Sequence, residues 1–290
     1  MKTKLITIIS VLVVIAGLAI LAYPIISNMM FQKSQQELID FYDSQINEIP
    51  EKTKDSMMEE CRKYNSGLLD SKVQLTDPFD ADALQIEAHP YVDLLNQNGD
   101  GSMGSIEIPG INCKLVIYHG TEEAVLAKGV GHLQGTSLPI GGKGTHSVLS
   151  GHTGTADKEL FTNLDQLDTG DVFYIHVWGE TLAYQVDNKE VVLPDETDSL
   201  YIDRESDLVT LVTCTPYGIN SHRLLVRGTR ISYEEAKKIE EQGSRVLLNT
   251  WSTQYVYAIL TGILISVAIV LAIIFVYRRI HKKRRAKEKK

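Results

Sequence analysis

A cysteine and an arginine nine residues apart are the residues of this sequence whose spacing most directly suggests chemistry. Cys214 ends an apolar, β-branched run over 210–213, and a Pro-Tyr-Gly turn follows at 216–218. A second apolar run begins just after Arg223. Two strands joined by this loop would bring the thiol and the guanidinium to the same edge of a sheet. A thiolate beside a fixed positive charge is a usable nucleophile at neutral pH.

His152 is the candidate general acid and base among the eight histidines of the sequence. It lies in a Ser-Gly-His-Thr-Gly turn (150–154) directly after a predicted strand, where flanking glycines permit a tight turn and leave the imidazole exposed. His222 is a weaker candidate because it adjoins Arg223, and neighbouring residues of a strand face opposite sides. A Cys–His pair would attack a carbonyl and protonate the leaving amine, while Arg223 would stabilise the oxyanion or hold the substrate backbone.

The elements that must position these residues are mostly short strands. Gly, Pro, Asn and Asp separate segments with strand periodicity at 104–109, 114–118, 145–150, 171–178, 182–186, 190–193, 208–213 and 223–227. Many short strands at close spacing predict a mostly-β barrel or sandwich. Short helices are predicted between strands at 121–128 and 158–164.

Helical periodicity marks both ends of the soluble part of the chain. Residues 31–49 and 54–66, separated by Pro50, predict a helical hairpin that leads away from a membrane. A charged amphipathic helix is predicted over 233–247, between the strands and a second membrane segment.

Two apolar runs without charged residues, 5–22 and 255–277, are each long enough to cross a bilayer as a helix. The first also fits a secretory signal peptide, but Ala-Tyr-Pro at 22–24 is a poor cleavage site, which favours a retained anchor. Basic residues precede the first run and follow the second, so both termini are expected in the cytoplasm and the domain between them outside the cell.

The charge of the domain between these runs argues against a nucleic-acid ligand. The two ends of the chain carry 11 of its 29 basic residues and one of its 37 acidic residues. The middle therefore has a net charge of −18, whereas neutralising phosphates needs excess positive charge.

Only three cysteines occur, too few for an exported domain held together by disulfides. Cys61 and Cys113 could pair and leave Cys214 free, although two unpaired, semi-buried thiols are the favoured interpretation. The sequence predicts no metal and no cofactor. The segment from Asn96 to Glu107 nearly fits a calcium loop, but it starts with Asn and its last residue lies in an alternating strand.

Several of these motifs together resemble those of class C, pilin-polymerising sortases. They are Thr-Leu-Val-Thr-Cys-Thr-Pro-Tyr at 210–217, His-Arg-Leu-Leu-Val-Arg-Gly at 222–228 and Leu-Ser-Gly-His-Thr-Gly at 149–154. Class C is suggested by Thr-Asp-Pro-Phe at 76–79, Ile-Tyr-His-Gly at 117–120 and the C-terminal apolar run. The resemblance covers roughly residues 30–280.

The resemblance implies an eight-stranded sortase β-barrel and a cysteine transpeptidase. Cys214 would cleave a Leu-Pro-x-Thr-Gly-like sorting signal between Thr and Gly and form a thioacyl enzyme, which a lysine amine of the next pilin would resolve. Asp77, Pro78 and Phe79 would form a lid, with Asp77 paired to Arg223 and Phe79 over Cys214, where the family often has Trp. Without the resemblance, Asp-Pro-Phe is an ordinary turn with a packed aromatic ring.

On this interpretation the chain has seven parts. They are a signal anchor (1–27), a helical segment (28–75), a lid loop (76–82), a catalytic barrel (83–232), a juxtamembrane helix (233–254), a transmembrane helix (255–277) and a basic cytoplasmic tail (278–290). The expected partners are pilin subunits with C-terminal sorting signals, and the membrane. The alternatives are an envelope cysteine peptidase with the same site, a cell-wall-anchoring sortase, and a membrane-anchored scaffold in which Cys214 is inert.

Overall fold

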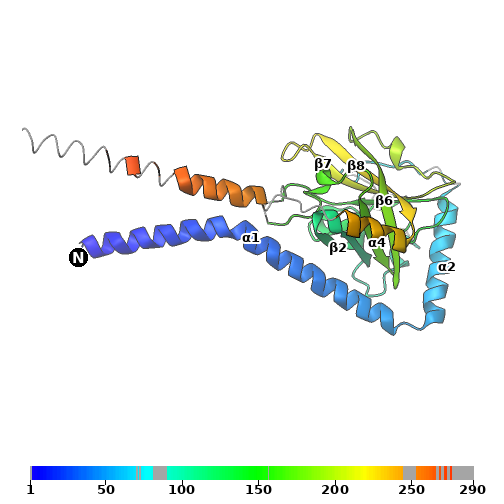
Figure 1. The fold of residues 1–290 in the computed structure, drawn as a ribbon. Helices are drawn as coiled ribbons and strands as arrows, with labels where there is room; N and C mark the ends of the chain where they lie inside the picture. The colour runs from blue at the N-terminus through cyan, green and yellow to red at the C-terminus, as the bar shows by residue number, and fades with distance from the viewer. Residues whose placement is uncertain are drawn as a thin grey trace, which may run out of the picture. The chain divides into compact units, whose positions relative to one another are not determined.

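The computed structural model describes residues 2–69, 71, 73–80, 90–155, 157–243, 253–265, 268, 271–272 and 275. The chain forms two compact units (Figure 1). The larger unit comprises residues 22–247, and the smaller combines residues 1–21 with 248–290. All residues of the candidate site belong to the larger unit.

Eight strands in the larger unit close into a barrel, as the resemblance implied (Figure 1). Their order around the barrel is β1-β2-β3-β4-β7-β8-β6-β5. The β2–β3 and β4–β7 pairs are parallel, and the other neighbours are antiparallel. The strands are β1 (Ser102–Ile108), β2 (Cys113–His119), β3 (Val130–His132), β4 (Thr145–Ser150), β5 (Val172–Val177), β6 (Glu180–Val192), β7 (Asp207–Thr215) and β8 (His222–Ile231).

Alternating apolar side chains from these strands form the main core inside the barrel. Leu149 of β4, Leu211 of β7 and Val226 of β8 are all fully buried there. Burying each such side chain stabilises the fold by about 1.5–3 kcal/mol. The residues between them in sequence therefore project outward, which leaves the outer face of β4, β7 and β8 available for a site.

Two predicted elements differ from those observed. The separate strands predicted at 182–186 and 190–193 are one long strand, β6, whose register shifts between Val186 and Asn188. The helix predicted at 158–164 is wrong: the segment forms turns and then a 3₁₀ helix, η3 (Leu164–Gln166). Phe161 and Leu164 are fully buried in the barrel core, so tertiary packing determines the local backbone.

The remaining short elements connect the strands. The helix predicted at 121–128 is present as α3 (Glu123–Leu126). Three further 3₁₀ helices are η1 (Tyr91–Asp93), η2 (Pro109–Ile111) and η4 (Asp198–Leu200).

The two helices predicted on either side of Pro50 are present, but they diverge from Pro50 and do not pack along each other as a hairpin (Figure 1). Helix α1 covers Lys2–Glu48, and α2 covers Glu51–Leu68. In the larger unit, α1 packs on the outside of the barrel through buried Ile39, Tyr42 and Ile46. The Tyr42 hydroxyl donates to the carbonyl oxygen of Met103 at 2.6 Å.

Gln35 fastens α1 to the barrel, so its removal should destabilise the fold. Its amide donates to Lys128 O and accepts from Val116 N, both at 3.0 Å, and its side chain is buried. We expect Gln35→Ala to lower the free energy of unfolding by about 3 kcal/mol, because two backbone groups lose their partner away from water. Urea unfolding of the full chain in detergent, followed by tryptophan fluorescence, measures this loss. Gln36→Ala is the control, because Gln36 bonds only to Asp40 on the exposed side of α1 and should leave stability unchanged.

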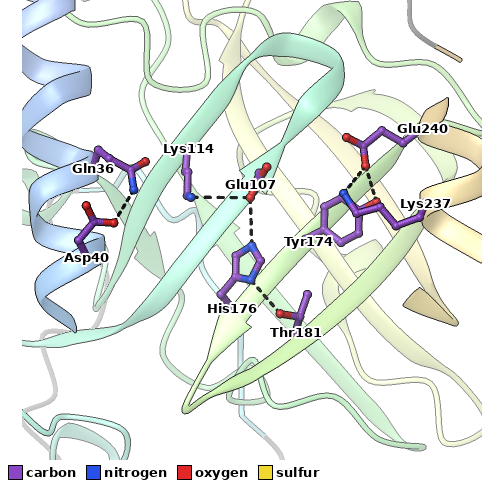
Figure 2. A network of polar contacts seen from close by, with 9 residues as sticks. All are labelled: Gln36, Asp40, Glu107, Lys114, Tyr174, His176, Thr181, Lys237 and Glu240. Carbon is purple, nitrogen blue, oxygen red and sulfur yellow. Dashed lines mark hydrogen bonds and ion pairs between the residues drawn. The ribbon is translucent and has the colours of Figure 1, made fainter. Parts of the chain in front are cut away.

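The predicted C-terminal helix is present as α4 (Tyr233–Gln242), which begins at the N-cap Ser232 and packs on β5 and β6 (Figure 1). Tyr174 of β5 donates to Glu240 at 2.8 Å, and Lys237 pairs with the same carboxylate (Figure 2). The helix was predicted to continue to residue 247, but 244–252 lie outside the described residues.

Glu107, the last residue of the calcium-like spacing, lies in strand β1, as the alternation predicted. It contacts His176 at 3.2 Å and Lys114 at 3.9 Å on the outer surface of the barrel (Figure 2). The hydrogen bond from His176 is the main reason that the pKa of Glu107 is lowered. Among the residues that the structure describes, no three His, Cys, Asp or Glu side chains gather as they would around a metal ion.

One helix segment, Ile15–Glu48 within α1, is long and apolar enough to cross a membrane among the described residues. It indicates membrane anchoring or a signal sequence. For the second predicted span, 255–277, the structure describes a continuous apolar helix over Thr253–Ile265 and four helical positions beyond it, and the described stretch alone is shorter than this test requires. That span therefore remains a prediction, and so does the tail at 278–290, which lies outside the described residues.

Candidate active site

Cys214 and Arg223 lie opposite each other near one end of the β7–β8 pair. The antiparallel register pairs the two residues directly. Side chains of directly opposed residues project from the same face of the sheet, with Cβ atoms about 5 Å apart. The strand–loop–strand unit predicted from the sequence thus brings thiol and guanidinium together at one edge of the barrel.

His152 reaches the same edge through the parallel β4–β7 pair. Ser150, the last residue of β4, is in register with Val212 of β7. The contact continues past the strand end, because Gly151 N donates to Val212 O at 3.0 Å and Thr213 Oγ1 donates to Gly151 O at 2.7 Å. These bonds place His152 beside the end of β7 that carries Cys214.

The two glycines that flank His152 have different roles. Gly154 has a φ of +76°, which glycine adopts without strain, as the predicted tight turn requires. Gly151 instead permits close packing, since a Cβ atom there would lie 2.8 Å from the ring of Phe161. Phe161 N also donates to His152 O at 3.0 Å, so the backbone at the histidine is held from the barrel core.

Segment 73–80 covers the outer face of β4, β7 and β8. Leu75 is buried against Val148, Val212 and Leu225, and Phe79 packs at the edge of this cluster. Phe79 lies between the candidate groups: its ring centroid is 5.8 Å from that of His152 and 5.1 Å from Cζ of Arg223.

Asp77 holds the guanidinium of Arg223 in a bidentate pair. Nε and Nη2 donate to the two carboxylate oxygens at 2.8 and 2.5 Å. The two side chains are 11% and 12% exposed, so little solvent screens the pair. Nη1 of Arg223 donates to the carbonyl oxygens of Asn220 and His222, so these contacts use four of the five N–H donors of the guanidinium.

Effects of opposite sign act on the pKa of the Cys214 thiol. Burial raises its pKa, the positive charge of Arg223 lowers it, and the negative charge of Asp77 raises it. With segment 73–80 in this position, the thiolate is therefore disfavoured. Withdrawal of the segment would remove Asp77 and part of the burial together, so both changes would lower the pKa of the thiol.

We expect Asp77→Ala to raise the rate at which a thiol reagent modifies Cys214 by roughly tenfold near neutral pH. The substitution removes a nearby negative charge and loosens the contact over the thiol, so the pH dependence of alkylation should move to lower pH. Mass spectrometry of the modified chain measures the rate. Asp187→Ala is a matched control, because Asp187 makes a similar pair with Arg227 away from Cys214. Equal rates for wild type and Asp77→Ala would contradict a covering role for this segment.

The other two cysteines are structural and free. Cys61 and Cys113 are both buried and unpaired, as the favoured interpretation of the sequence had it. Burial raises the pKa of Cys61 to about 12 and raises that of Cys113 as well. Cys214, which is only partly buried, is therefore the thiol expected to react.

Three other histidines have structural roles. His132 is fully buried, its Nε2 donates to Ser137 O at 2.8 Å, and burial lowers its pKa to about 4. Nδ1 and Nε2 of His119 each lie 2.9 Å from a backbone carbonyl oxygen, and the ring of His146 contacts Tyr201 O and the Thr210 hydroxyl. Burial is the main cause that lowers the pKa of both. None of the three is exposed at the Cys214 edge. His222 does lie at this edge, opposite Thr215, but it neighbours Arg223 in strand β8 and so faces the other side of the sheet. His152 therefore stays the candidate for chemistry beside Cys214.

One polar contact at this edge has no recognisable pattern in the sequence. Oε2 of Glu123, the first residue of α3, lies 3.1 Å from Nε2 of His152. The two residues are 29 positions apart in the chain, and an exposed glutamate in a short helix carries no distinguishing pattern.

A mixed eight-stranded barrel whose rim joins a cysteine, a histidine and an arginine defines a cysteine acyltransferase of sortase type. Residues 106–231 match the model of the sortase domain. Sortase C-1 from Streptococcus pneumoniae is 43% identical, with a TM-score of 0.63, and the match covers 68% of this chain and 99% of that one. The pilus-related sortase C of Group B Streptococcus is also 43% identical, with a TM-score of 0.62 over 67% of this chain and 96% of that one.

Among curated proteins, sortase D of Bacillus subtilis (strain 168) is 30% identical over 132 residues. That match covers 44% of this chain and 64% of the relative, so the chain spans somewhat less than two thirds of the relative's length. The two solved sortase C structures are more similar, at 43% identity, and their match covers nearly the whole of those chains. The chain therefore belongs to the sortase family of cysteine transpeptidases, and its structural neighbours include class C pilus sortases.

Proposed function

We propose that this chain polymerises pilins by transpeptidation at a Leu-Pro-x-Thr-Gly-like sorting signal. The observation that carries the proposal is the convergence at one barrel rim of Cys214, His152 and Arg223, from β7, the turn after β4, and β8. Nucleophile, proton carrier and charge stabiliser are the three functions that acyl transfer through a thioester requires.

The reaction has two halves that use the same groups. In the first, Cys214 Sγ attacks the threonine carbonyl, the Thr–Gly bond breaks, and His152 gives a proton to the departing glycine amine. In the second, a lysine amine attacks the thioester, His152 accepts a proton from it, and the thiolate leaves. Arg223 donates hydrogen bonds to the oxyanion that forms in each half.

The segment Asp77-Pro78-Phe79 acts in this proposal as a lid. Asp77 occupies two donors of Arg223, and Phe79 lies against both His152 and Arg223, so substrate and lid compete for the same groups. The lid has to move before a sorting signal can bind. This arrangement supports assignment to class C, and similarity to a pilus-related sortase C points to pilin subunits as substrates.

The catalytic barrel works outside the cell in this proposal. The N-terminal part of α1 anchors the chain, and the apolar run at 255–277 forms a second span, so that both termini are cytoplasmic. Sorting signals of exported pilins would then meet the enzyme on the extracellular side of the cell membrane.

An amine-competition assay tests the proposed reaction. The full chain in detergent is incubated with a labelled Leu-Pro-x-Thr-Gly peptide, with and without a lysine-containing pilin peptide. We expect a thioacyl adduct on Cys214 and, with the lysine peptide, an isopeptide-linked product at the expense of hydrolysis. Hydrolysis that added amine does not change would identify a peptidase instead. Preference for an N-terminal glycine amine over lysine would identify a wall-anchoring enzyme.

A further inference from the structure

Glu123 contacts the imidazole in a way that fixes which ring nitrogen carries a proton. Its Oε2 lies 3.1 Å from Nε2 of His152, and an ionised carboxylate can only accept hydrogen bonds. Nε2 must therefore donate, which leaves Nδ1 of the neutral ring as the nitrogen that can take up a proton.

The helix that carries Glu123 is held in place by the barrel. Leu126, one turn further along α3, is buried against β3, where Gly131 leaves room for it. Lys158, in the loop after His152, donates to Ala127 O at the end of α3 at 2.6 Å. The carboxylate and the imidazole are thus attached to parts of the chain that are tied to each other.

The side of α1 that faces the barrel supports this same region. Asn28 Oδ1 accepts from Glu159 N at 3.0 Å, and Lys158 lies over the ring of Phe31 at 5.2 Å. Gln35 bonds to Lys128 O just beyond α3. The end of α3 and the loop after His152 therefore share one support on α1, so the Glu123–His152 contact does not depend on the lid.

We propose that Glu123 is a positioning residue for His152, holding the ring in the tautomer and orientation in which Nδ1 exchanges protons with the thiol and the substrate amines. The inference rests on the function proposed above for this site. Two other charged groups lie near the imidazole of His152: Arg223, which lies against the ring of Phe79, and Asp77, which pairs with Arg223. Their charges neutralise each other in the bidentate pair. Glu123 is the carboxylate in hydrogen-bond contact with His152 among the described residues.

The solvent exposure of the two side chains limits how much the loss of Glu123 can lower kcat. The Glu123 side chain is 82% exposed and that of His152 is 21% exposed, so solvent screens the interaction. The interaction free energy of an exposed ion pair reaches about 1 kcal/mol, and the loss of that much stabilisation lowers kcat about fivefold. A positioning role predicts that KM for the sorting peptide stays within about twofold, because Glu123 does not hold the substrate.

The test uses two readouts on the full chain with Glu123→Ala, Glu123→Gln and the neighbouring control Glu122→Gln. Nitrogen-15 NMR of histidine-labelled protein reports the tautomer of His152, assigned by its loss in His152→Ala. Peptide cleavage gives kcat and KM. We expect Glu123→Ala to release the ring into a mixture of tautomers and lower kcat about fivefold, and Glu123→Gln, which keeps an acceptor oxygen, to fall between it and wild type.

Two results would overturn the inference. One is an unchanged Nε2–H tautomer in Glu123→Ala, and the other is an unchanged kcat in a variant whose tautomer has changed. If wild type shows no peptide cleavage, the proposed function fails, and the tautomer measurement alone then decides whether Glu123 positions the ring. An equal effect of Glu122→Gln on both readouts would also count against a specific role for Glu123.

Discussion

Cys214→Ala is expected to abolish the thioacyl intermediate and to lower transpeptidation by at least about 10⁴-fold. The substitution removes the sulfur proposed to attack the sorting signal, and the buried thiols of Cys61 and Cys113 cannot replace it. The measurement is intact-mass spectrometry of the chain after incubation with a sorting peptide, combined with product formation over hours. Wild type should gain the mass of the acyl group, and the variant should gain none.

The fold should survive this change, because Cys214 is only partly buried near the end of β7. Thermal unfolding of wild type and variant should therefore give similar midpoints. Cys61→Ala is the matched control: it removes a thiol far more buried than Cys214 and should lose stability while it keeps acyl transfer. An acylated Cys214→Ala chain, or cleavage at the wild-type rate, would refute the assignment of the nucleophile.

The sequence predicted the Cys214–Arg223 pair well because the contact is local. A short loop joins two strands with clear periodicity, and their antiparallel register makes the two residues neighbours. The break between two helices at Pro50 and the helix that begins after the N-cap Ser232 were predictable for the same reason, since their boundaries are set by nearby residues.

Contacts between distant segments could not be predicted from residue patterns. His152 meets the end of β7 through the parallel β4–β7 pair, and no spacing within the sequence encodes that pairing. The glycine-flanked turn indicated His152 in the sequence, whereas the pairing of Asp77 with Arg223 came from the resemblance to sortases. Neither of them indicated Glu123, which is exposed and reaches His152 only because α3 packs on β3.

The incorrect helix at 158–164 and the merged strand β6 illustrate the same limit at the level of secondary structure. Phe161 points into the core, and its packing against Gly151 shapes the turn that carries His152. In β6, the register shift near Asp187 reads in sequence as a break between two strands, whereas β8 continues alongside it without interruption. In both cases the local sequence pattern was present, but packing against neighbouring segments determined the secondary structure that formed.

Arg223→Lys should separate two roles that one guanidinium combines. Arginine presents a planar set of donors, which lysine replaces with a single ammonium group. We expect kcat/KM for the sorting peptide to fall by about 10²–10³-fold, the loss typical of an oxyanion donor. The bidentate pair with Asp77 is lost as well, so the lid should loosen and alkylation of Cys214 should become faster, not slower.

A lower kcat/KM together with faster alkylation of Cys214 would show that Arg223 both acts in catalysis and holds the lid. If Arg223 acted only by lowering the pKa of Cys214, retention of a positive charge in lysine would preserve most of the activity. If it acted only as an anchor for the lid, the variant would be more active than wild type. Arg227→Lys is the matched control, since Arg227 lies on the same strand, pairs in the same bidentate manner with Asp187 and does not face Cys214. That variant should change neither rate, and a comparable loss of kcat/KM in it would show that strand β8, and not the guanidinium at position 223, is the sensitive element.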